Sequence, residues 1–296
     1  MSKIGIAGAG RMGTAMAQRL MDQGYEVAVW NRTRDKLDPL VDAGAEAVDT
    51  PAQLAAKADI VLSCLTNAGA VDIVYRGTDG LLAGAAGGTV FVEMSTVQPD
   101  IQRTLANDVR TSGGIFVECP VGGTTGPARQ GKLLGFVGGD EADIARAKPV
   151  LEALCRRIEH VGPVGNGASV KLAINLPLIV FWQAFGEALS LCRDVGLAPD
   201  RTADLFADSS GGPNVLKNRA AAVASALGGD RVPGTFDIDS MRKDLRTMLA
   251  EAGDMGVDLP ITAQTLACYD ETAAAGLGTC DGANEAAYWR TRPKRG

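Results

Sequence analysis

A glycine-rich turn near the N-terminus restricts the fold more than any other feature of the sequence. Gly8-Ala9-Gly10-Arg11-Met12-Gly13 directly follows an apolar run, Lys3–Ala7, and precedes a segment whose apolar residues recur every four positions. A strand, a Gly-x-Gly-x-x-Gly turn and an amphipathic helix, in this order, predict a dinucleotide-binding loop whose glycines allow close backbone approach to a pyrophosphate. The residues expected to contact the cofactor here are Gly8, Gly10, Arg11, Met12 and Gly13.

The rest of the first half repeats this alternation of short apolar runs and helical patterns. Continuous Val/Ile/Leu strands followed by helices are typical of a parallel sheet covered on both faces. The further expected strands are Tyr25–Trp30, Ile60–Leu65, Thr89–Glu93, Ile115–Cys119, Leu134–Val137 and Arg157–Val161. We therefore predict an α/β protein with a Rossmann-type doubly wound parallel sheet in its N-terminal domain, residues 1–162.

After about Val161 the strand patterns stop, and an all-helical C-terminal domain is expected over residues 163–296. Its first helical pattern, Gly167–Val195, contains Pro177, which should kink or restart the helix. The other expected helices are Pro199–Asp208, Asp239–Met255, Pro260–Ala275 and Gly282–Trp289. The first helix is long and apolar, so a second subunit or a second domain must cover it.

The end of the second strand indicates which dinucleotide is bound. An NAD-specific site would place an Asp or Glu there to bind the ribose 2′-hydroxyl group. This chain has Asn31-Arg32-Thr33 instead. A guanidinium group can bind a 2′-phosphate through two hydrogen bonds, and Asn31 and Thr33 can add donors. The sequence thus predicts NADP(H), with solvated surface arginines as the alternative.

Composition excludes several classes of function. The 296 residues carry a formal net charge of -6, which gives no basic surface for nucleic acid or an acidic membrane. His160 is the only histidine, so histidine metal sites and histidine relays are not expected, and no metal is predicted. Six cysteines without regular spacing, and no leader or membrane-span pattern, favour the cytoplasm.

Without histidine, proton transfer needs another group. Lys171 and Asn175 are four residues apart and therefore share one face of a helix near the domain junction. A lysine on a buried face needs partners, and burial would lower its pKa toward neutrality, where it can exchange a proton with an alcohol. A structural lysine that extends its ammonium group to solvent explains the position equally well.

Five ordered segments together resemble the β-hydroxyacid dehydrogenase family, which includes 3-hydroxyisobutyrate dehydrogenase, tartronate semialdehyde reductase and glyoxylate/succinic semialdehyde reductases. The resemblance covers nearly the whole chain. The segments are the Gly8–Gly13 turn, Glu93-Met94-Ser95-Thr96, Pro120-Val121-Gly122-Gly123, Lys171 with Asn175, and Lys243-Asp244-Leu245.

The resemblance implies roles for these residues. Lys171 would be the catalytic acid/base and Asn175 would orient the substrate. The implied substrate-binding residues are Ser95, Gly122, Gly123, Thr124 and Phe236, and further cofactor contacts are implied for Leu65, Thr66, Thr96 and Lys243. Members of the family usually form dimers or tetramers through the helical domain, so a homodimer or homotetramer is expected.

Three segments depart from the family pattern. The substrate loop commonly reads Pro-Val-Ser-Gly-Gly, whereas this chain has glycine at position 122 and a hydroxyl only at Thr124. Pro213 stands where relatives often carry an aromatic residue, and Ser240 where an apolar one is common. These differences affect the identity of the substrate and leave the type of reaction unchanged.

The expected function is therefore the NADP(H)-dependent interconversion of a short hydroxy acid and its semialdehyde or keto acid. An NADPH-dependent imine reductase is the alternative enzyme, because such enzymes resemble this fold and share an Asn-Arg-Thr segment. They usually carry another residue at the position of Lys171. A catalytically silent NADPH-binding protein is the alternative from another class.

Overall fold

The protein is described by a computed structural model, which covers residues 2–292. It divides into two compact units, Met1–Leu172 and Ala173–Gly296. Helix α9, Asn166–Leu191, begins in the first unit and continues into the second. The first turns of α9, which include Lys171, thus belong to the sheet unit.

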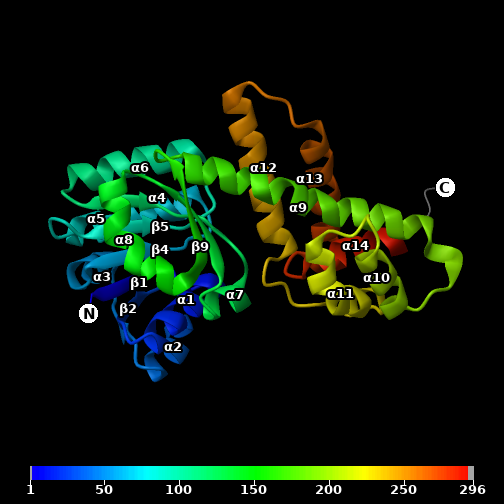
Figure 1. The fold of residues 1–296 in the computed structure, drawn as a ribbon, viewed down its shortest axis with the longest axis horizontal. Coiled ribbons are helices and arrows are strands. Elements are labelled where there is room, and N and C mark those ends of the chain that lie inside the picture. Colours follow the sequence, from blue (N-terminus) through cyan, green and yellow to red (C-terminus); the bar gives the residue numbers. More distant parts are fainter. Residues whose placement is uncertain (1, 293–296) are drawn as a thin grey trace. The chain divides into compact units, whose positions relative to one another are not determined.

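The first unit is built on one mostly parallel sheet (Figure 1). Its strands are β1 Lys3–Ala7, β2 Glu26–Trp30, β3 Glu46–Ala47, β4 Ile60–Ser63, β5 Val90–Glu93, β6 Ile115–Glu118, β7 Val121–Gly122, β8 Leu133–Gly138 and β9 Cys155–Gly162. The order β3-β2-β1-β4-β5-β6 is that of a dinucleotide-binding domain, and it reverses between β1 and β4. Beyond β6, β8 runs antiparallel to β6 and β7, and β9 runs parallel to β8.

Helices cover both faces of this sheet. They are α1 Arg11–Asp22, α2 Asp38–Asp42, α3 Pro51–Lys57, α4 Ala68–Arg76, α5 Leu81–Gly84, α6 Pro99–Thr111, α7 Thr125–Arg129 and α8 Glu141–Leu154, with a 3₁₀ turn, η1, at Arg34–Leu37. On β5, Val90 and Val92 face the core under α1 and α8, whereas Phe91 faces the core under α3, α4 and α6 (Figure 1). Burial on both faces explains why these strands are continuously apolar.

The second unit is helical, as the sequence predicts. After α9 it contains the 3₁₀ turn η2 Arg193–Val195, then α10 Pro199–Asp208, α11 Asn214–Leu227, α12 Ile238–Met255, α13 Pro260–Thr272, a π-helical turn η3 Ala273–Leu277 and α14 Gly282–Thr291. Helix α11 was not expected. It is rich in alanine and only weakly amphipathic, with Leu216, Val223 and Ala226 buried, so its sequence shows no clear apolar stripe.

Helix α9 runs through Pro177 as one element, so the expected restart of the helix there was wrong. A proline inside a helix removes one backbone hydrogen bond, and here the loss is offset by burial of Ile179, Trp182 and Phe185. By length and composition alone, α9 is also long and apolar enough to cross a membrane. Part of its apolar surface is buried, 44% of that stretch, and the hydroxyl of Tyr269 donates to the carbonyl of Ile179.

Candidate active site

The glycine-rich turn has the geometry that a pyrophosphate needs. Gly8 has a φ of 97°, and a Cβ there would lie 2.6 Å from the carbonyl oxygen of Cys64. A Cβ on Gly13 would lie 2.0 Å from the carbonyl oxygen of Gly8. Around Gly10 the space is open, because a Cβ there would meet nothing within 4 Å. Gly8 and Gly13 are thus required by packing, whereas Gly10 leaves room for a ligand.

The start of α1 suits an anion. No side chain caps it at Gly10, and its first turn contains no acidic residue. The N–H groups and the positive end of the helix dipole therefore point to the open side of the turn. Residues Gly8 to Gly13 fit a dinucleotide on these grounds.

After β2, one of two neighbouring arginines is held by the protein. The guanidinium group of Arg34 donates to the carbonyl of Val48 at 3.3 Å and lies 3.7 Å from the carboxylate of Asp49. Arg32 is exposed and forms no hydrogen bond or ion pair with the residues that the structure describes. Of the two arginines, Arg32 is therefore the one available to a ligand at this edge of the sheet.

The side chain of Asn31 shapes the same loop. Its amide donates to the carbonyl oxygen of Thr33 at 2.8 Å, a local hydrogen bond that holds the turn after β2. The expected donation from Asn31 to a phosphate thus competes with a contact that the loop itself uses.

Residues after β4 and β5 meet beside the turn. The backbone N–H of Leu65 donates to Oγ of Ser95 at 2.8 Å, and a Cβ on Gly8 would come within 2.9 Å of the Leu65 side chain. Gly8, Leu65 and Ser95 therefore lie together at the carboxyl ends of the strands, where ligands of open parallel sheets bind. Thr66 is exposed and Thr96 half-buried, each next to a member of this group.

A buried carboxyl group supports Ser95. Oε1 of Glu93 accepts the backbone N–H of Ser95 at 2.7 Å, and its other oxygen accepts the hydroxyl of Ser63, which also contacts the hydroxyl of Tyr75 at 2.6 Å. Burial raises the pKa of Glu93 and the hydroxyl contacts lower it. In the sequence, Glu93 stands out only as part of a motif, although an acid at the end of an apolar strand is itself a visible signal.

The expected substrate loop contains two different kinds of glycine. Gly123 has a φ of 122°, and a Cβ there would lie 2.9 Å from Leu133, so a side chain is disfavoured on both grounds. Gly122 lies on β7, opposite Leu134, and a Cβ would meet its nearest neighbour at 3.6 Å. A side chain would therefore fit at position 122, so packing does not require glycine there. Thr124 is half-buried and precedes α7.

Lys171 lies in the second turn of α9 and is 8 % exposed. The start of this helix is held by Glu118, a fully buried residue at the end of β6. The carboxylate of Glu118 accepts the backbone N–H groups of Gly165 at 2.6 Å and Ala168 at 2.5 Å. Glu118 was not predicted from the sequence, because its partners are about fifty residues further along the chain.

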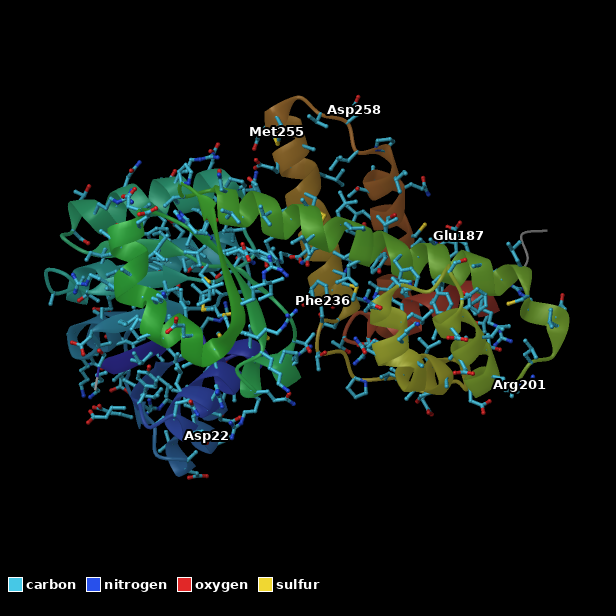
Figure 2. The ribbon with its side chains drawn as sticks, viewed as in Figure 1. Asp22, Glu187, Arg201, Phe236, Met255 and Asp258 are labelled. Atoms are coloured by element: carbon cyan, nitrogen blue, oxygen red, sulfur yellow. The ribbon has the colours of Figure 1, made fainter. Side chains whose placement is uncertain are left out.

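In the second unit, Asn175 and Lys243 meet at one carboxylate. The amide of Asn175 donates to Oδ2 of the buried Asp244 at 2.8 Å, and the ammonium group of Lys243 pairs with Oδ1. Asn175 and Lys243, both predicted site residues, are thus joined through Asp244, which was predicted only as part of a motif. Phe236, labelled in Figure 2, is half-buried in the segment before α12.

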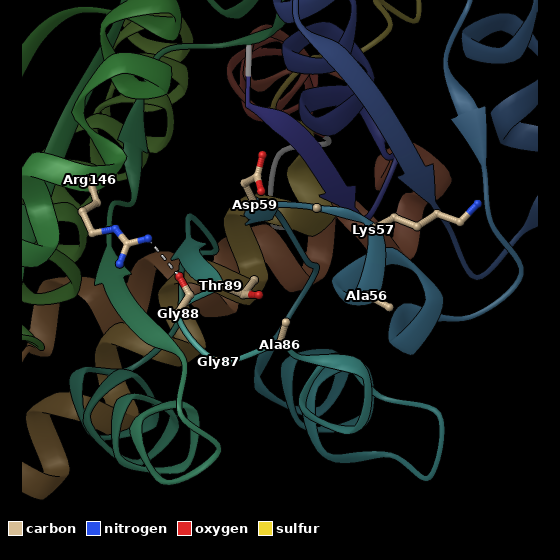
Figure 3. A pocket seen from close by; sticks show the side chains of 9 residues that line it. Ala56, Lys57, Asp59, Ala86, Gly87, Gly88, Thr89 and Arg146 are labelled. Carbon is tan, nitrogen blue, oxygen red and sulfur yellow. Dashed lines mark hydrogen bonds between the residues drawn. The ribbon is translucent and has the colours of Figure 1, made fainter.

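A separate pocket of about 400 Å³ lies at the other end of the strands (Figure 3). Asp59 and Thr89, which line it, precede β4 and β5, and Arg146 donates to the carbonyl of Gly88 at 3.2 Å. It therefore opens at the amino ends of the strands, away from Gly8 and Ser95. Within residues 2–292, no three His, Cys, Asp or Glu side chains form a group that could hold a metal ion.

Comparison with known proteins agrees with this architecture. The NAD binding domain of 6-phosphogluconate dehydrogenase matches residues 3–162. The NAD-binding domain of NADP-dependent 3-hydroxyisobutyrate dehydrogenase matches residues 165–289. The chain is 30% identical to glyoxylate/succinic semialdehyde reductase 1 of Arabidopsis thaliana over 94% of this chain and 95% of the relative. It is 34% identical to 2-(hydroxymethyl)glutarate dehydrogenase of Eubacterium barkeri, covering 94% and 92%.

Solved structures also match this chain over nearly its whole length. A 3-hydroxyisobutyrate dehydrogenase from Salmonella typhimurium superposes with a TM-score of 0.87 at 25% identity, over 97% of this chain and 99% of that one. A protein described as Psf3 in complex with NADP+ and 2-OPP has a TM-score of 0.86 at 26% identity, covering 97% and 99%. An imine reductase from Myxococcus stipitatus, at 20% identity and a TM-score of 0.63 over 96% and 98%, shares the fold.

The fold, the glycine-rich turn and these matches define an NAD(P)-dependent oxidoreductase that acts on hydroxy acids. The chain belongs to the β-hydroxyacid dehydrogenase family, of the 3-hydroxyisobutyrate dehydrogenase and glyoxylate/succinic semialdehyde reductase type.

Proposed function

We propose that this enzyme uses NADP(H) to interconvert a short hydroxy acid and its semialdehyde or keto acid, with Lys171 as acid/base. The observation that carries the proposal is a nearly buried lysine, 8 % exposed, on the helix that also carries Asn175. The relatives named above as semialdehyde reductase and hydroxy acid dehydrogenase support the substrate class.

The cofactor proposal rests on Arg32. It is exposed, it forms no hydrogen bond or ion pair within the described chain, and no carboxylate follows β2 in the place that would bind a ribose 2′-hydroxyl. The turn from Gly8 to Gly13 would hold the pyrophosphate, and Arg32 the 2′-phosphate. The NADP+ complex of the Psf3 protein supports this assignment.

The reduced cofactor, when bound, supplies the hydride, and the protein supplies the proton and the orientation. In the direction of reduction, Lys171 Nζ gives a proton to the carbonyl oxygen of the substrate and takes it back in the reverse direction. Ser95 and the backbone of Gly122 and Gly123 bind the carboxylate. Asn175, fixed by Asp244, orients the reacting oxygen.

Replacement of Lys171 by Met tests the acid/base role. We expect turnover to fall by at least about 10²-fold, the lower part of the range for general acid–base catalysis, while the Kd for NADPH stays within a factor of two. Glyoxylate, succinic semialdehyde, tartronate semialdehyde and a cyclic imine are the substrates to assay with both cofactors. Turnover of the imine alone would instead indicate an imine reductase, and NADPH binding without any turnover a silent binding protein.

The assembly is proposed to be a homodimer or homotetramer formed through the helical unit. Leu191, Val195 and Leu205, at the end of α9 and in the two elements that follow it, are 92%, 63% and 60% exposed. Large exposed apolar side chains on neighbouring elements are typical of surfaces that bind another protein. Sedimentation equilibrium checks the proposal, and a Leu191→Glu, Leu205→Glu variant should be a monomer.

A further inference from the structure

Glu118 lies at the end of β6, and its side chain binds backbone N–H groups at the start of α9. Its carboxylate accepts from Gly165 and Ala168, and the N–H of Gly167 also stabilises it. The first N–H groups of a helix have no partners within the helix, and a carboxylate there also complements the helix dipole. The residue is fully buried, so these bonds are made away from solvent.

Glycines fix the position of this carboxyl group. A Cβ on Gly138 of β8 would lie 2.4 Å from Oε2 of Glu118, and a Cβ on Gly167 would lie 3.0 Å from its Cδ. Gly167 would also meet the carbonyl oxygen of Phe136 at 2.6 Å. A side chain at either glycine would therefore displace the carboxyl group or the start of the helix.

The same residue connects two parts of the proposed site. Glu118 ends β6, two residues before Pro120, which opens the substrate loop. Ala168 precedes Lys171 by three residues, so the bond to its N–H lies about 4.5 Å along the helix axis from Lys171. One carboxyl group thus ties the loop and the start of α9 together.

We propose that Glu118 is a positioning residue, which holds α9 against the end of β6 and thereby sets the place of the Lys171 ammonium group. The inference rests on the proposed role of Lys171. A displacement of about 1 Å in a reacting group can lower a rate by about 10²-fold, so the anchor of this helix should control turnover.

The surroundings of Glu118 also make its charge sensitive to pH near neutrality. Burial raises its pKa from 4.5 to about 7, against the lowering effects of the three N–H groups and of Arg103 on α6. Arg103 itself pairs with the exposed Asp100. The buried thiol of Cys119 directly follows β6, and Glu93 on β5 is the register partner of Glu118. Gly138 on β8 adds no charge.

Protonation of Glu118 would change what it can bind. The ionised form offers lone pairs to all the N–H donors, whereas the neutral acid carries a proton on one oxygen and accepts fewer bonds. We therefore expect turnover to decline as the pH falls through about 7, with Glu118 responsible for that acidic limb.

The test is Glu118→Gln in the full-length enzyme, with glyoxylate and succinic semialdehyde as substrates and NADPH as cofactor. Its amide keeps the size of the side chain but places an NH₂ group against an N–H donor. We expect kcat to fall about 10- to 100-fold, with KM and the Kd for NADPH within a factor of three, and the acidic limb of the kcat profile to disappear. Glu141→Gln, a matched change of an exposed acid in the first turn of α8, should leave all of these unchanged.

A folded Glu118→Gln enzyme with wild-type kcat and an unchanged acidic limb would overturn the inference. A parallel decrease in kcat, in affinity for NADPH and in melting temperature would also overturn the inference. It would indicate that Glu118 has only a structural role. If this variant does not fold, Glu118→Asp tests the proposal instead. Aspartate keeps the charge, so the acidic limb of the kcat profile should persist and kcat should be intermediate. A wild-type kcat in Glu118→Asp contradicts the proposal. Lys171→Met separates the positioning role of Glu118 from the acid/base role of Lys171. Full activity of the Lys171→Met enzyme refutes the acid/base role, irrespective of the results for Glu118.

Discussion

The side-chain amide of Asn175 donates a 2.8 Å hydrogen bond to the carboxylate of Asp244, which also pairs with the ammonium group of Lys243. Asn175 is therefore held in one orientation by a residue 69 positions away. An amide can rotate to present either its oxygen or its nitrogen to a ligand. Because Asp244 binds the nitrogen of Asn175, the orientation of the amide oxygen toward a substrate is set by this contact.

Replacement of Asp244 by Asn should lower kcat/KM by about 10- to 100-fold. The variant loses the charge that pairs with Lys243 and weakens the bond that orients Asn175, and bonds to charged groups contribute about 1.5–3 kcal/mol. Steady-state kinetics with glyoxylate and NADPH measures the effect. Asp258→Asn, at the exposed position labelled in Figure 2, is the control, and an equal loss there would contradict the prediction.

Replacement of Arg32 by Glu should reverse the preference for the cofactor. The variant places a negative charge where the 2′-phosphate is proposed to bind, so kcat/KM for NADPH should fall about 10²-fold while the value for NADH changes little. Arg34→Gln should have a smaller effect, because Arg34 is held by Val48 and Asp49. A native enzyme that prefers NADH would refute the assignment directly.

Gly122 and Gly123 should respond differently to the same substitution. A serine at 122 has room and restores the hydroxyl common in the family, so we expect an unchanged melting temperature and a several-fold lower KM for a carboxylate-bearing aldehyde. A serine at 123 must adopt a φ of 122° and contacts Leu133, which should lower the free energy of unfolding by about 1–2 kcal/mol. Thermal denaturation and kinetics on both variants check this contrast.

The stability of the protein should fall as the pH rises toward 8. Burial raises the pKa of Glu285 on α14 from 4.5 to about 8, although Trp289 donates to it at 2.9 Å. The folded protein therefore binds this proton more tightly than the unfolded chain, so the contribution is complete below about pH 4.5 and is lost as the pH rises through about 8.

Glu285→Gln should make that dependence shallower, because the amide does not ionise. Melting temperatures from pH 5 to 9 measure it for both proteins. The exposed Glu141→Gln variant should keep the native slope. An identical slope in the Glu285 variant would show that other groups cause the loss.

Local patterns in the sequence predicted most of the fold. The strand Lys3–Ala7 and the helix Pro199–Asp208 have the bounds expected from their apolar and proline positions, and the glycine turn lies between strand and helix as expected. These features depend on residues close in the chain, whose periodicity and backbone freedom are visible in the sequence. Where the periodicity is weak, as in Asn214–Leu227, the prediction failed.

Only the tertiary structure decided which distant groups meet. The sequence by itself predicted the cofactor turn, the arginine after the second strand and Lys171 on its helix as parts of the site. It could not show that Glu118 binds the N–H groups at the start of that helix, or that Asp244 joins Asn175 to Lys243. The partner of a buried carboxylate depends on how strands and helices pack, and donors some fifty to seventy residues away leave no periodic trace in the chain.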